Sequence, residues 1–323
     1  MIQEGIGGYF EMELPDYGGF LHDDGVLLNS GRNALEYVLR SLPDVNHLWI
    51  PYYTCDVILE PIKKLNVSYS FYRIDERLEI RDSIELRAGN FLLYTNYFGI
   101  KDGFVRQLAE KYGARLIVDN AQAWYANPIP GTNTIYSPRK YVGIPDGGVA
   151  YCPSGIDIEQ FERDNSYERC SHLLKRIDLG PSAGYPDYRA NSKSLVNQPI
   201  RRMSRLTERI LRAIDFDSIK QKRWDNFLYL DARLRKENLL PFAVFSSIEC
   251  PMVYPFLVKN PSLKELMIKN RVFVATYWPN VPEWDTLSGV ETRLAQELVC
   301  LPIDQRYGES EMGEIVSLTN QQV

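Results

Sequence analysis

The residues best suited to chemistry lie in one stretch of the sequence, residues 115–152. Asp119 directly follows the apolar run at residues 116–118, so we expect its carboxylate at the carboxyl end of a buried strand, where open α/β sheets bind ligands. Lys140 stands in a Ser-Pro-Arg-Lys turn shortly before a glycine pair. A lysine amine can hold a carbonyl compound covalently, and a carboxylate can stabilise a cation. The two side chains therefore favour a ligand-binding site at this end of the sheet.

The spacing of four positions in this stretch forms a recognisable pattern. Gln122 stands three residues after Asp119, Lys140 follows about twenty residues later, and Gly147-Gly148 begins seven residues beyond the lysine. This pattern resembles the pyridoxal-phosphate (PLP) enzymes of fold type I, most closely the DegT/DnrJ/EryC1/StrS family of sugar aminotransferases. The resemblance extends loosely over most of the chain. Its other parts are similar to the family's first helix start, strand-to-helix turn and next active-site loop, at residues 29–35, 50–54 and 96–99.

The resemblance implies that the cofactor is pyridoxal 5'-phosphate and that Lys140 is the catalytic residue, holding the cofactor as a Schiff base. Once free, the Lys140 amine would carry a proton to and from the substrate's α-carbon. Asp119 would keep the pyridine nitrogen protonated, and Gln122 would hold the phenolic oxygen. Because phosphate binds well at a helix N-terminus, three residues that begin the first helix and one hydroxyl before the lysine would hold the cofactor's phosphate: Ser30, Gly31, Arg32 and Ser137.

The chain departs from the family pattern at three places. The family's phosphate-binding serine, five residues before the lysine, is replaced by Ile135. The aromatic residue that stacks on the cofactor ring corresponds to Cys55, and we name Tyr53 as its possible replacement. The family's Gly-Tyr-Asn-Tyr-Arg segment, which reaches the neighbouring subunit, is echoed only by Gly-Tyr-Pro-Asp-Tyr-Arg at residues 184–189. We therefore expect a rebuilt phosphate site and altered subunit contacts.

Taken one at a time, these residues also have ordinary structural interpretations. An aspartate at a strand end is commonly a helix cap or an ion-pair partner, and an isolated lysine is commonly a solvated surface residue. The glycine pair is equally compatible with a hairpin or a bulge. Cys55 is more typical of a small buried residue than of a nucleophile. The joint occurrence of Asp119 and Lys140 with Gln122, Ser137, the glycine pair and Ser30-Gly31 is what favours a PLP site.

Three functions remain open from the sequence. The leading hypothesis is an aminotransferase of sugar biosynthesis, which moves an amino group from an amino acid to a keto-sugar or nucleotide-linked keto-sugar. Another PLP reaction, elimination or decarboxylation, is the first alternative. The second is a non-catalytic binding or regulatory member of the fold. Lys140 argues against the family's sugar dehydratases, which resemble these enzymes but have histidine at that position.

The order of the predicted elements favours an α/β fold with a mainly parallel central sheet flanked by helices. With 323 residues, the chain is long enough for a large PLP-binding domain at residues 1–200 and, at 201–323, a long helix with a smaller C-terminal α/β domain. Polar sequence at 153–198 indicates long loops with short helices, and 200–234 a long helix broken near 215–217. Strands are predicted at 47–53, 67–74, 90–97, 115–120, 134–136, 147–152, 251–258 and 271–277, and the other helices at 29–42, 54–65, 103–112, 263–270 and after 309.

The overall charge favours a small molecule as the ligand. A formal net charge of -5 argues against a nucleic-acid or anionic-membrane partner, because both reward a basic surface. The basic stretch at residues 201–212 alternates with apolar residues at helical spacing, which indicates a solvated helix face. We expect no nucleic acid and no membrane among the partners, only an amino-acid donor and a small keto acceptor.

The remaining composition indicates a soluble protein without metal or disulfide. Five cysteines at unrelated spacings and three histidines do not form a metal-binding or disulfide pattern. The first residues are acidic and glycine-rich, unlike a secretory signal, and no uninterrupted apolar run is long enough to span a membrane. We expect a cytoplasmic protein. By analogy with fold-type-I enzymes, which build each active site between two subunits, we also expect a homodimer.

Overall fold

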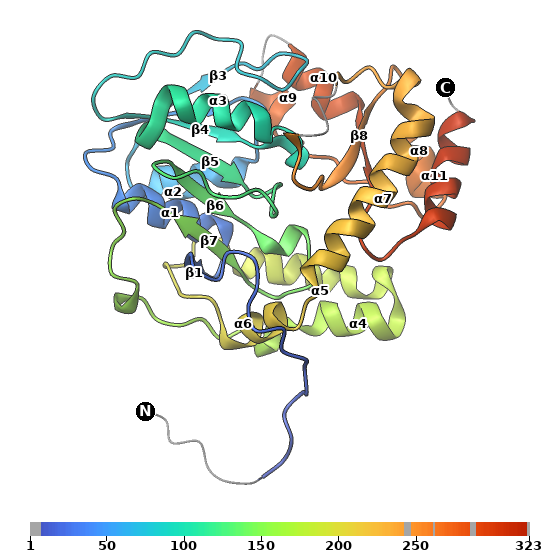
Figure 1. Cartoon of the computed structure of the whole chain (residues 1–323), viewed down its shortest axis with the longest axis horizontal. Coiled ribbons are helices and arrows are strands. Elements are labelled where there is room, and N and C mark those ends of the chain that lie inside the picture. Colours follow the sequence, from blue (N-terminus) through green and yellow to red (C-terminus); the bar gives the residue numbers. More distant parts are fainter. Residues whose placement is uncertain (1–7, 242–246, 261, 285–288, 322–323) are drawn as a thin grey trace.

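The centre of the molecule is a seven-stranded sheet, seen in a computed structural model that describes residues 8–241, 247–260, 262–284 and 289–321 (Figure 1). The strand order is β1-β7-β6-β5-β4-β2-β3. Strands β6, β5, β4, β2 and β3 run parallel, whereas β7 is antiparallel to both of its neighbours. This confirms the predicted mainly parallel sheet. The bounds are β1 (Val26–Leu28), β2 (His47–Pro51), β3 (Ser68–Tyr72), β4 (Asn90–Thr95), β5 (Leu116–Asn120), β6 (Asn133–Tyr136) and β7 (Gly148–Tyr151).

Helices cover both faces of this sheet (Figure 1). Side chains of β5 alternate between the faces: Ile117 packs with residues of α1 (Gly31–Ser41) and α2 (Leu59–Lys64), whereas Val118 packs with residues of α3 (Asp102–Tyr112). A parallel strand covered on both sides excludes water from both faces, which explains why β4 and β5 are nearly continuous apolar runs. The two helix layers also fix the direction of each strand side chain, because every second side chain of a strand points to the same layer.

The first helix starts where the sequence predicts. Ser30 is extended, and its side-chain oxygen accepts a hydrogen bond from the Asn33 backbone N–H at 3.2 Å, which is an N-cap. At the C-terminal end of α3, Gly113 adopts φ 51°, a conformation that favours glycine. These two residues set the ends of the predicted helices at 29–42 and 103–112. The predicted helix at 54–65 is a 3₁₀ turn (Asp56–Ile58) followed by α2.

The polar region between the two parts of the chain contains two helices rather than mainly loops. These are α4 (Ser171–Leu179) and α5 (Pro181–Ser194), which pack against each other and are joined at Gly180, with φ 84°. A Cβ at Gly184 would lie 2.7 Å from the His172 carbonyl oxygen, so a glycine is required for this close approach. The segment at 184–189 that echoes the family motif is therefore helical and forms part of α5. We call α4 and α5 together the helical hairpin.

The C-terminal part has a second, smaller sheet. Helices α6 (Arg205–Arg212) and α7 (Phe216–Leu234) are separated by Asp215, whose side chain caps α7 by accepting from the Ser218 N–H at 2.9 Å. This confirms the predicted break. The remaining elements are the antiparallel strands β8 (Val253–Leu257) and β9 (Leu298–Pro302) and the helices α8 (Ser262–Lys269), α9 (Val281–Trp284), α10 (Val290–Glu297) and α11 (Glu309–Asn320).

One predicted strand, at residues 271–277, is wrong. This segment makes a single bridge, between Ala275 and Cys300, and the partner of β8 is β9 instead. Arg271 and Trp278, at its two ends, have φ values of 64° and 58°, which interrupt the extended backbone. Its apolar residues still serve the core: Val274 and Trp278 are buried. Strand β1 was not predicted, because only three of its residues pair.

The C-terminal elements share a core of their own. Phe227 and Leu230 of α7 pack with residues of β8, β9 and α11, and this cluster is separate from the two that line the faces of the large sheet. A smaller α/β unit is thus present, as expected, whereas the domain boundary at residue 200 stays a prediction. No helix within the described ranges is both long and apolar enough to cross a membrane.

Candidate active site

Asp119 and Lys140 both lie at the carboxyl ends of neighbouring parallel strands. Asp119 is the fourth residue of β5, is 7% exposed, and accepts a hydrogen bond from the Ala121 N–H at 2.9 Å. Burial raises the pKa of its carboxyl group, and the Lys140 ammonium opposes this rise. Lys140 ends the 3₁₀ turn Pro138–Lys140 that follows β6, and its side chain is exposed. A reactive amine thus lies open to a ligand while remaining close enough to act electrostatically on a buried carboxylate.

Cys55, at the sequence position where the family resemblance predicts a stacking aromatic, is partly buried. Burial raises the pKa of Cys55, while the Val57 N–H and then Lys140 lower it, so Cys55 lies in the same neighbourhood as the lysine. The Tyr53 ring, in contrast, is 1% exposed and packs edge-on against Trp278 with ring centroids 4.4 Å apart. The Tyr53 ring is therefore engaged in core packing, and a contact between it and a cofactor stays a prediction.

Gln122 is fully buried and is hydrogen-bonded to two other segments of the chain. Its Oε1 accepts from the Phe98 N–H at 2.9 Å, and its backbone oxygen accepts from the Tyr141 hydroxyl at 2.7 Å. Its Nε2 has no hydrogen-bond partner among the described residues. A buried amide donor without a partner is costly, so its presence indicates an acceptor that binds there. Phe98 itself has φ 55°, uncommon for a bulky residue, and Gln122 holds it in place.

The N-terminus of α1 faces the residue three before the lysine. An ideal Cβ at Gly31 would lie 3.4 Å from the Ser137 Cβ and 3.6 Å from its Oγ. Arg32, next in α1, forms an ion pair with Glu60 at 3.3 Å, which directs its guanidinium toward α2 and leaves its backbone N–H in the helix N-terminus. Gly31, Arg32 and Ser137 are therefore brought together, as predicted from the sequence for an anion site. Ile135 is buried in the core and offers no polar atom.

The glycine pair has a steric reason. A Cβ at Gly148 would fall on the carbonyl of Ser30, well inside van der Waals contact. Gly147 adopts φ 133° and donates its N–H to the Asn29 oxygen at 2.7 Å. The start of β7 thus passes directly against the residue that caps α1. The role of the glycines is to let two backbones approach, which couples the helix N-terminus to the turn that carries Lys140.

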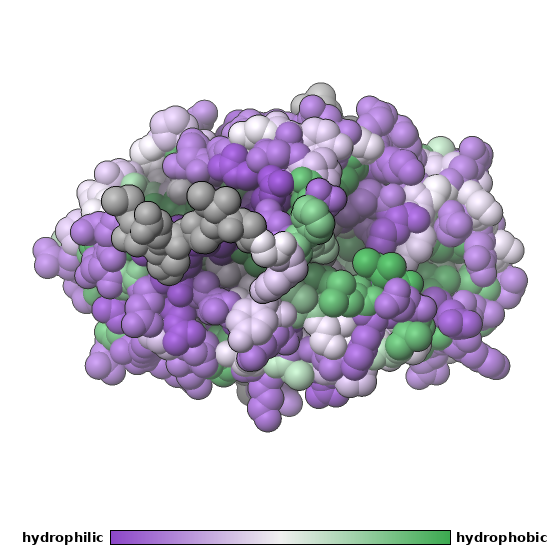
Figure 2. Space-filling model, turned by 90° about the horizontal axis from the view of Figure 1, so that it is seen from below, coloured by the Kyte–Doolittle hydropathy of each residue, from purple (hydrophilic) through white to green (hydrophobic). Residues whose placement is uncertain are grey.

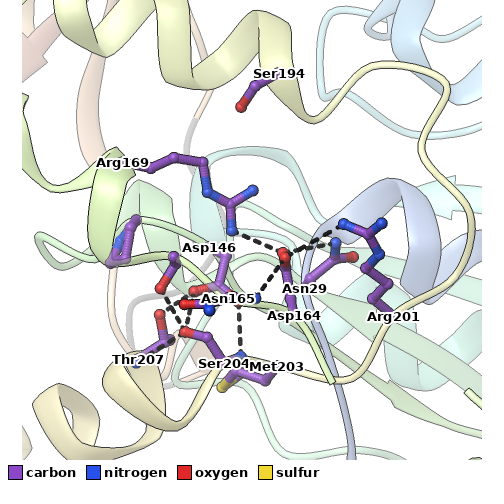
Figure 3. A network of polar contacts seen from close by, with 12 residues as sticks. Asn29, Asp146, Asp164, Asn165, Arg169, Ser194, Arg201, Met203, Ser204 and Thr207 are labelled. Carbon is purple, nitrogen blue, oxygen red and sulfur yellow. Dashed lines mark hydrogen bonds and ion pairs between the residues drawn. The ribbon is translucent and has the colours of Figure 1, made fainter. Parts of the chain in front are cut away.

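A network of polar contacts holds the residues that precede the Ser30 cap and the glycine pair (Figure 3). Asp164 accepts from Asn29 Nδ2 at 3.0 Å and from Arg169 Nη2 at 2.7 Å. Asp146, directly before the glycine pair, accepts from the Ser204 N–H at 2.9 Å and its hydroxyl at 2.7 Å, and from the Thr207 hydroxyl. Burial raises the Asp146 pKa, which these hydrogen bonds lower in turn. The network was not predicted from the sequence, and it holds Asn29 and Asp146, which directly precede the Ser30 cap and the glycine pair.

Two further polar residues near the site were also missed. Thr95 pairs in register with Asp119 in the sheet, and its buried hydroxyl has no partner among the described residues. Arg139, directly before Lys140, donates to the Ser192 hydroxyl at 3.4 Å, and burial lowers its pKa. A polar residue at the end of the apolar strand β4 was the available signal for Thr95. No sequence signal distinguished Arg139 from a surface cation.

A large cleft lies between the helical hairpin and the C-terminal unit. Its volume is about 1130 Å³, and Asp119 and Lys140 do not line it. Aromatic and basic side chains share its lining: Tyr185 and Tyr188 of α5, with Arg271 and Arg306 from the C-terminal part. Within the described residues, no group of three or more His, Cys, Asp or Glu side chains could hold a metal ion.

Comparisons with known proteins identify the fold. No protein-family model and no curated protein matches the sequence. The structure, however, superimposes on many solved ones. The sugar aminotransferase CalS13 from Micromonospora echinospora has a TM-score of 0.62 and 14% identity, over 92% of this chain and 86% of that one. The chain has the aminotransferase fold. At this identity, the likeness establishes the fold of PLP enzymes of type I and leaves function to the site.

Two further neighbours carry informative descriptions. A DegT/DnrJ/EryC1/StrS aminotransferase from Brucella abortus has a TM-score of 0.60 and 14% identity, over 92% of this chain and 85% of that one. The ntda protein of Bacillus subtilis, solved with bound cofactor PMP, has a TM-score of 0.59 and 14% identity, over 92% and 72%. The family resemblance in the motif and the resemblance in fold thus agree.

Proposed function

We propose that this chain is a PLP-dependent aminotransferase that transfers an amino group from an amino acid to a keto-sugar or nucleotide-linked keto-sugar. The observation that carries the proposal is the position of exposed Lys140 in the turn after β6, next to strand β5, whose carboxyl end carries the buried Asp119 carboxylate. The fold shared with sugar aminotransferases supports the substrate class. We propose membership of the DegT/DnrJ/EryC1/StrS family on the same grounds.

The residues present fit PLP. The unpartnered Nε2 of buried Gln122 would donate to the phenolic oxygen, which is an acceptor. Asp119 offers a carboxylate to the pyridine nitrogen, and a buried carboxylate is a strong partner for a cation because water screens it little. For the phosphate, the backbone N–H groups at Gly31 and Arg32 and the Ser137 hydroxyl are the nearest candidates, and the Ser30 cap fixes the helix end that presents them.

Two departures from the family pattern are consistent with this fit. Ser137 lies against Gly31, so its hydroxyl can take the phosphate contact that Ile135 cannot make. Cys55 lies near Lys140 and leaves more room over the cofactor ring than an aromatic side chain would. We propose Cys55, rather than Tyr53, as the residue beside the ring, because the Tyr53 ring packs against Trp278.

The side chains of this chain would perform the reaction in the following way. When bound, PLP supplies an electron sink that acidifies the hydrogen on the amino acid's α-carbon. Lys140 would hold the cofactor covalently, and its amine, when free, would act as general base and acid at the α-carbon of the substrate. Asp119 would keep the pyridine nitrogen cationic, and Gln122 would orient the ring.

The assembly and location follow from the same proposal. We propose a homodimer in the cytoplasm, with an amino-acid donor and a small keto acceptor as its partners. The open position of Lys140 supports the dimer, because a second subunit would enclose the amine. Enclosure would exclude water and strengthen the interaction between Lys140 and Asp119.

The first experiment measures covalent cofactor binding. Purified protein incubated with PLP is expected to show a visible absorption band that sodium borohydride abolishes, with the label on the peptide that contains Lys140. The Lys140→Ala variant should show only free PLP, while Arg139→Ala, a matched change of the neighbouring cation, should keep the labelled lysine. A wild-type protein without any band would refute the proposal in favour of a non-catalytic member of the fold.

The second experiment separates transamination from other PLP reactions. The PLP-loaded protein is incubated with single amino acids, and conversion of the cofactor to its pyridoxamine form is followed by absorption. Conversion by one or a few amino acids is expected. Release of carbon dioxide or loss of a substrate side-chain group, with the cofactor unchanged, would instead indicate decarboxylation or elimination.

A further inference from the structure

Thr95 is a polar residue in an apolar part of the core. Hydrophilic residues dominate the face of the molecule shown in Figure 2, where water solvates them. Thr95, in contrast, ends β4 and is 1% exposed, and its hydroxyl has no hydrogen-bond partner among the described residues. A buried hydroxyl without a partner is costly, and valine, of almost the same shape, would avoid this cost. Because Thr134 also has such a hydroxyl, the neighbours of Thr95 decide what it does.

The neighbour of Thr95 in the sheet is the carboxylate proposed to bind the ring nitrogen. Thr95 and Asp119 pair in register on the parallel strands β4 and β5, and neighbouring strands lie about 4.8 Å apart. Leu93 and Ile117, two positions earlier on each strand, belong to the cluster packed against α1 and α2. Since every second side chain points to the same face, Thr95 and Asp119 point there too. A hydroxyl and a carboxylate thus stand side by side at the ends of two strands.

Hydrogen bonds on the other face of the sheet hold the two strand ends in this register. The Asn96 backbone N–H donates to the Asp119 backbone oxygen at 3.0 Å. Asn96 Nδ2 donates to Asn120 Oδ1 at 3.0 Å and to Asp102 Oδ1 at 2.6 Å. Asp102 belongs to α3, so these amides lie on the face opposite to α1 and α2. They fix the two strand ends, and with them the separation between Thr95 and Asp119.

The Asp119 carboxylate has room for a further donor. Among the described residues, only the Ala121 N–H donates to it, at 2.9 Å. An ionised carboxylate accepts up to about four hydrogen bonds. Burial raises the pKa of this carboxyl group, and a second donor would oppose that rise, because a hydrogen bond to the charged form favours the charge. The Thr95 hydroxyl is a free donor on the adjacent strand, at the position where such a bond is needed.

We infer that Thr95 is a positioning residue whose hydroxyl donates to the Asp119 carboxylate and keeps it ionised against the ring nitrogen of bound PLP. The inference rests on the proposed function. A carboxylate held by two donors, Thr95 and the Ala121 N–H, has less affinity for a proton. The proton shared with the ring therefore stays on the nitrogen, and the ring stays cationic. Thr95 acts through Asp119 and does not contact the substrate.

Binding of pyridoxamine 5'-phosphate, which forms no Schiff base, tests Thr95 separately from Lys140. Thr95→Val should raise the dissociation constant about 10-fold, because a hydrogen bond to a charged group is lost. Thr95→Ser keeps the hydroxyl and should bind within about twofold of the wild type. Thr134→Val is the matched control and should leave binding unchanged. Thr134 is equally buried and its hydroxyl is also unpartnered among the described residues, but it pairs with Val118, which packs on the α3 face.

An analogue of pyridoxamine phosphate with carbon in place of the ring nitrogen separates this role from a structural one. Thr95→Val should change the dissociation constant of the analogue less than about twofold, since the analogue shares no ring proton with Asp119. Melting of the apoprotein is the second readout. Thr95→Val should melt at or above the wild-type temperature, because it removes a buried hydroxyl that has no partner among the described residues.

Four results would overturn the role of Thr95. These are unchanged binding by Thr95→Val, equal weakening of both compounds, failure of Thr95→Ser to bind, and a Thr95→Val apoprotein that melts well below the wild type. The borohydride-sensitive PLP band of the wild type, recorded in parallel, reports the proposed function separately. A wild type without the band loses both proposals, whereas a wild type that has the band and gives any of these four results loses only the role of Thr95.

Discussion

The carboxyl end of the large sheet and the helical hairpin are built on different principles. At the sheet end, Asp119, Gln122 and Gly148 are buried and are held by contacts with other elements of the same chain. In the hairpin, Ile177 and Tyr185 stand in water, and most contacts of the two helices are with each other. The buried residues of the first region are held by their own chain, whereas the second region has an open face.

This difference separates a region suited to ligand binding, the sheet end, from a region suited to contacts with a partner, the hairpin. Buried strand ends hold ligand-binding groups rigidly, because parallel strands fix both the position and the direction of each side chain. A hairpin of two helices with exposed apolar residues is free to vary and to meet a partner. Four substitutions separate these roles, from the largest expected effect to the smallest.

Lys140→Ala should abolish covalent cofactor binding and lower the transamination rate by about 10³-fold or more, because no other amine can both hold the cofactor and move the proton. Single-turnover absorption measurements with an amino-acid donor check this. Addition of a small primary amine should restore part of the proton transfer. A variant with more than a tenth of the wild-type rate would break the assignment of Lys140.

Asp119→Asn should reduce the rate by about 100-fold, because an amide cannot stabilise the cationic ring nitrogen. The stability of the apoprotein, in contrast, should increase with this substitution. Burial raises the Asp119 pKa in the folded protein, so the charged carboxylate opposes folding. The wild-type apoprotein therefore loses stability as the pH rises through the folded pKa. At pH 7 the apo variant is therefore expected to melt at a higher temperature than the apo wild type.

The pH dependence of that difference is the control. It should shrink as the pH falls below the raised folded pKa toward 3.8, the ordinary value for the carboxyl group, because Asp119 then becomes protonated in the folded protein. Thermal melting of the two apoproteins between pH 4 and 8 measures it. A variant that is less stable than the wild type at pH 7 would show that Asp119 acts mainly as a structural hydrogen-bond acceptor for Ala121.

Gly148→Ala should destabilise the protein by about 3 kcal/mol, because the added Cβ meets the backbone of Ser30 and neither strand nor helix can move freely. PLP affinity should fall as well, since the same shift displaces the N-terminus of α1. Urea unfolding and a PLP titration measure the two effects. Gly103→Ala, within α3 and facing the flexible Ser247 side chain at 3.2 Å, is the matched control and should be nearly neutral.

Gly184→Ala should have the smallest effect, about 1 kcal/mol, because the strain against the His172 carbonyl is partly offset by the better helix propensity of alanine. PLP affinity should stay within about twofold of the wild type, whereas the dimer should weaken. The two quantities are measured by titration and sedimentation. A loss of cofactor binding equal to that of Gly148→Ala would show that the two regions are not independent.

The sequence allowed the sheet end to be predicted, and physics explains why. Burial leaves few residue types possible on β4 and β5, so a carboxylate at position 119 is conspicuous among apolar neighbours. The start of the first helix at Ser30 and the helix break near Asp215 were also predictable, because each depends on a hydrogen bond to a residue three positions away. Elements with a strong local pattern were therefore predicted to within a few residues.

The rest depends on distant partners. Asp164 meets Asn29 across 135 positions and Asp146 meets Ser204 across 58, so a single polar residue in a loop carries no local sign of its role. Residues 271–277 are rich in strand-forming residues, yet the tertiary packing of Trp278 overrides that preference. The hairpin lacks a sustained apolar period because apolar residues, such as Ile177 and Leu179, also stand on its exposed surface.

The position of β1 has a consequence for how the protein is made. This strand enters the sheet beside β7 and pairs Val26 with Ala150, although α1 follows it directly in the chain. During synthesis, the first helix leaves the ribosome long before the strand that anchors it exists. Such distant pairings form slowly, since loop closure must precede them. The nascent polypeptide therefore acquires its ligand-binding end late, and truncation anywhere before Ser204 would leave that end unfinished.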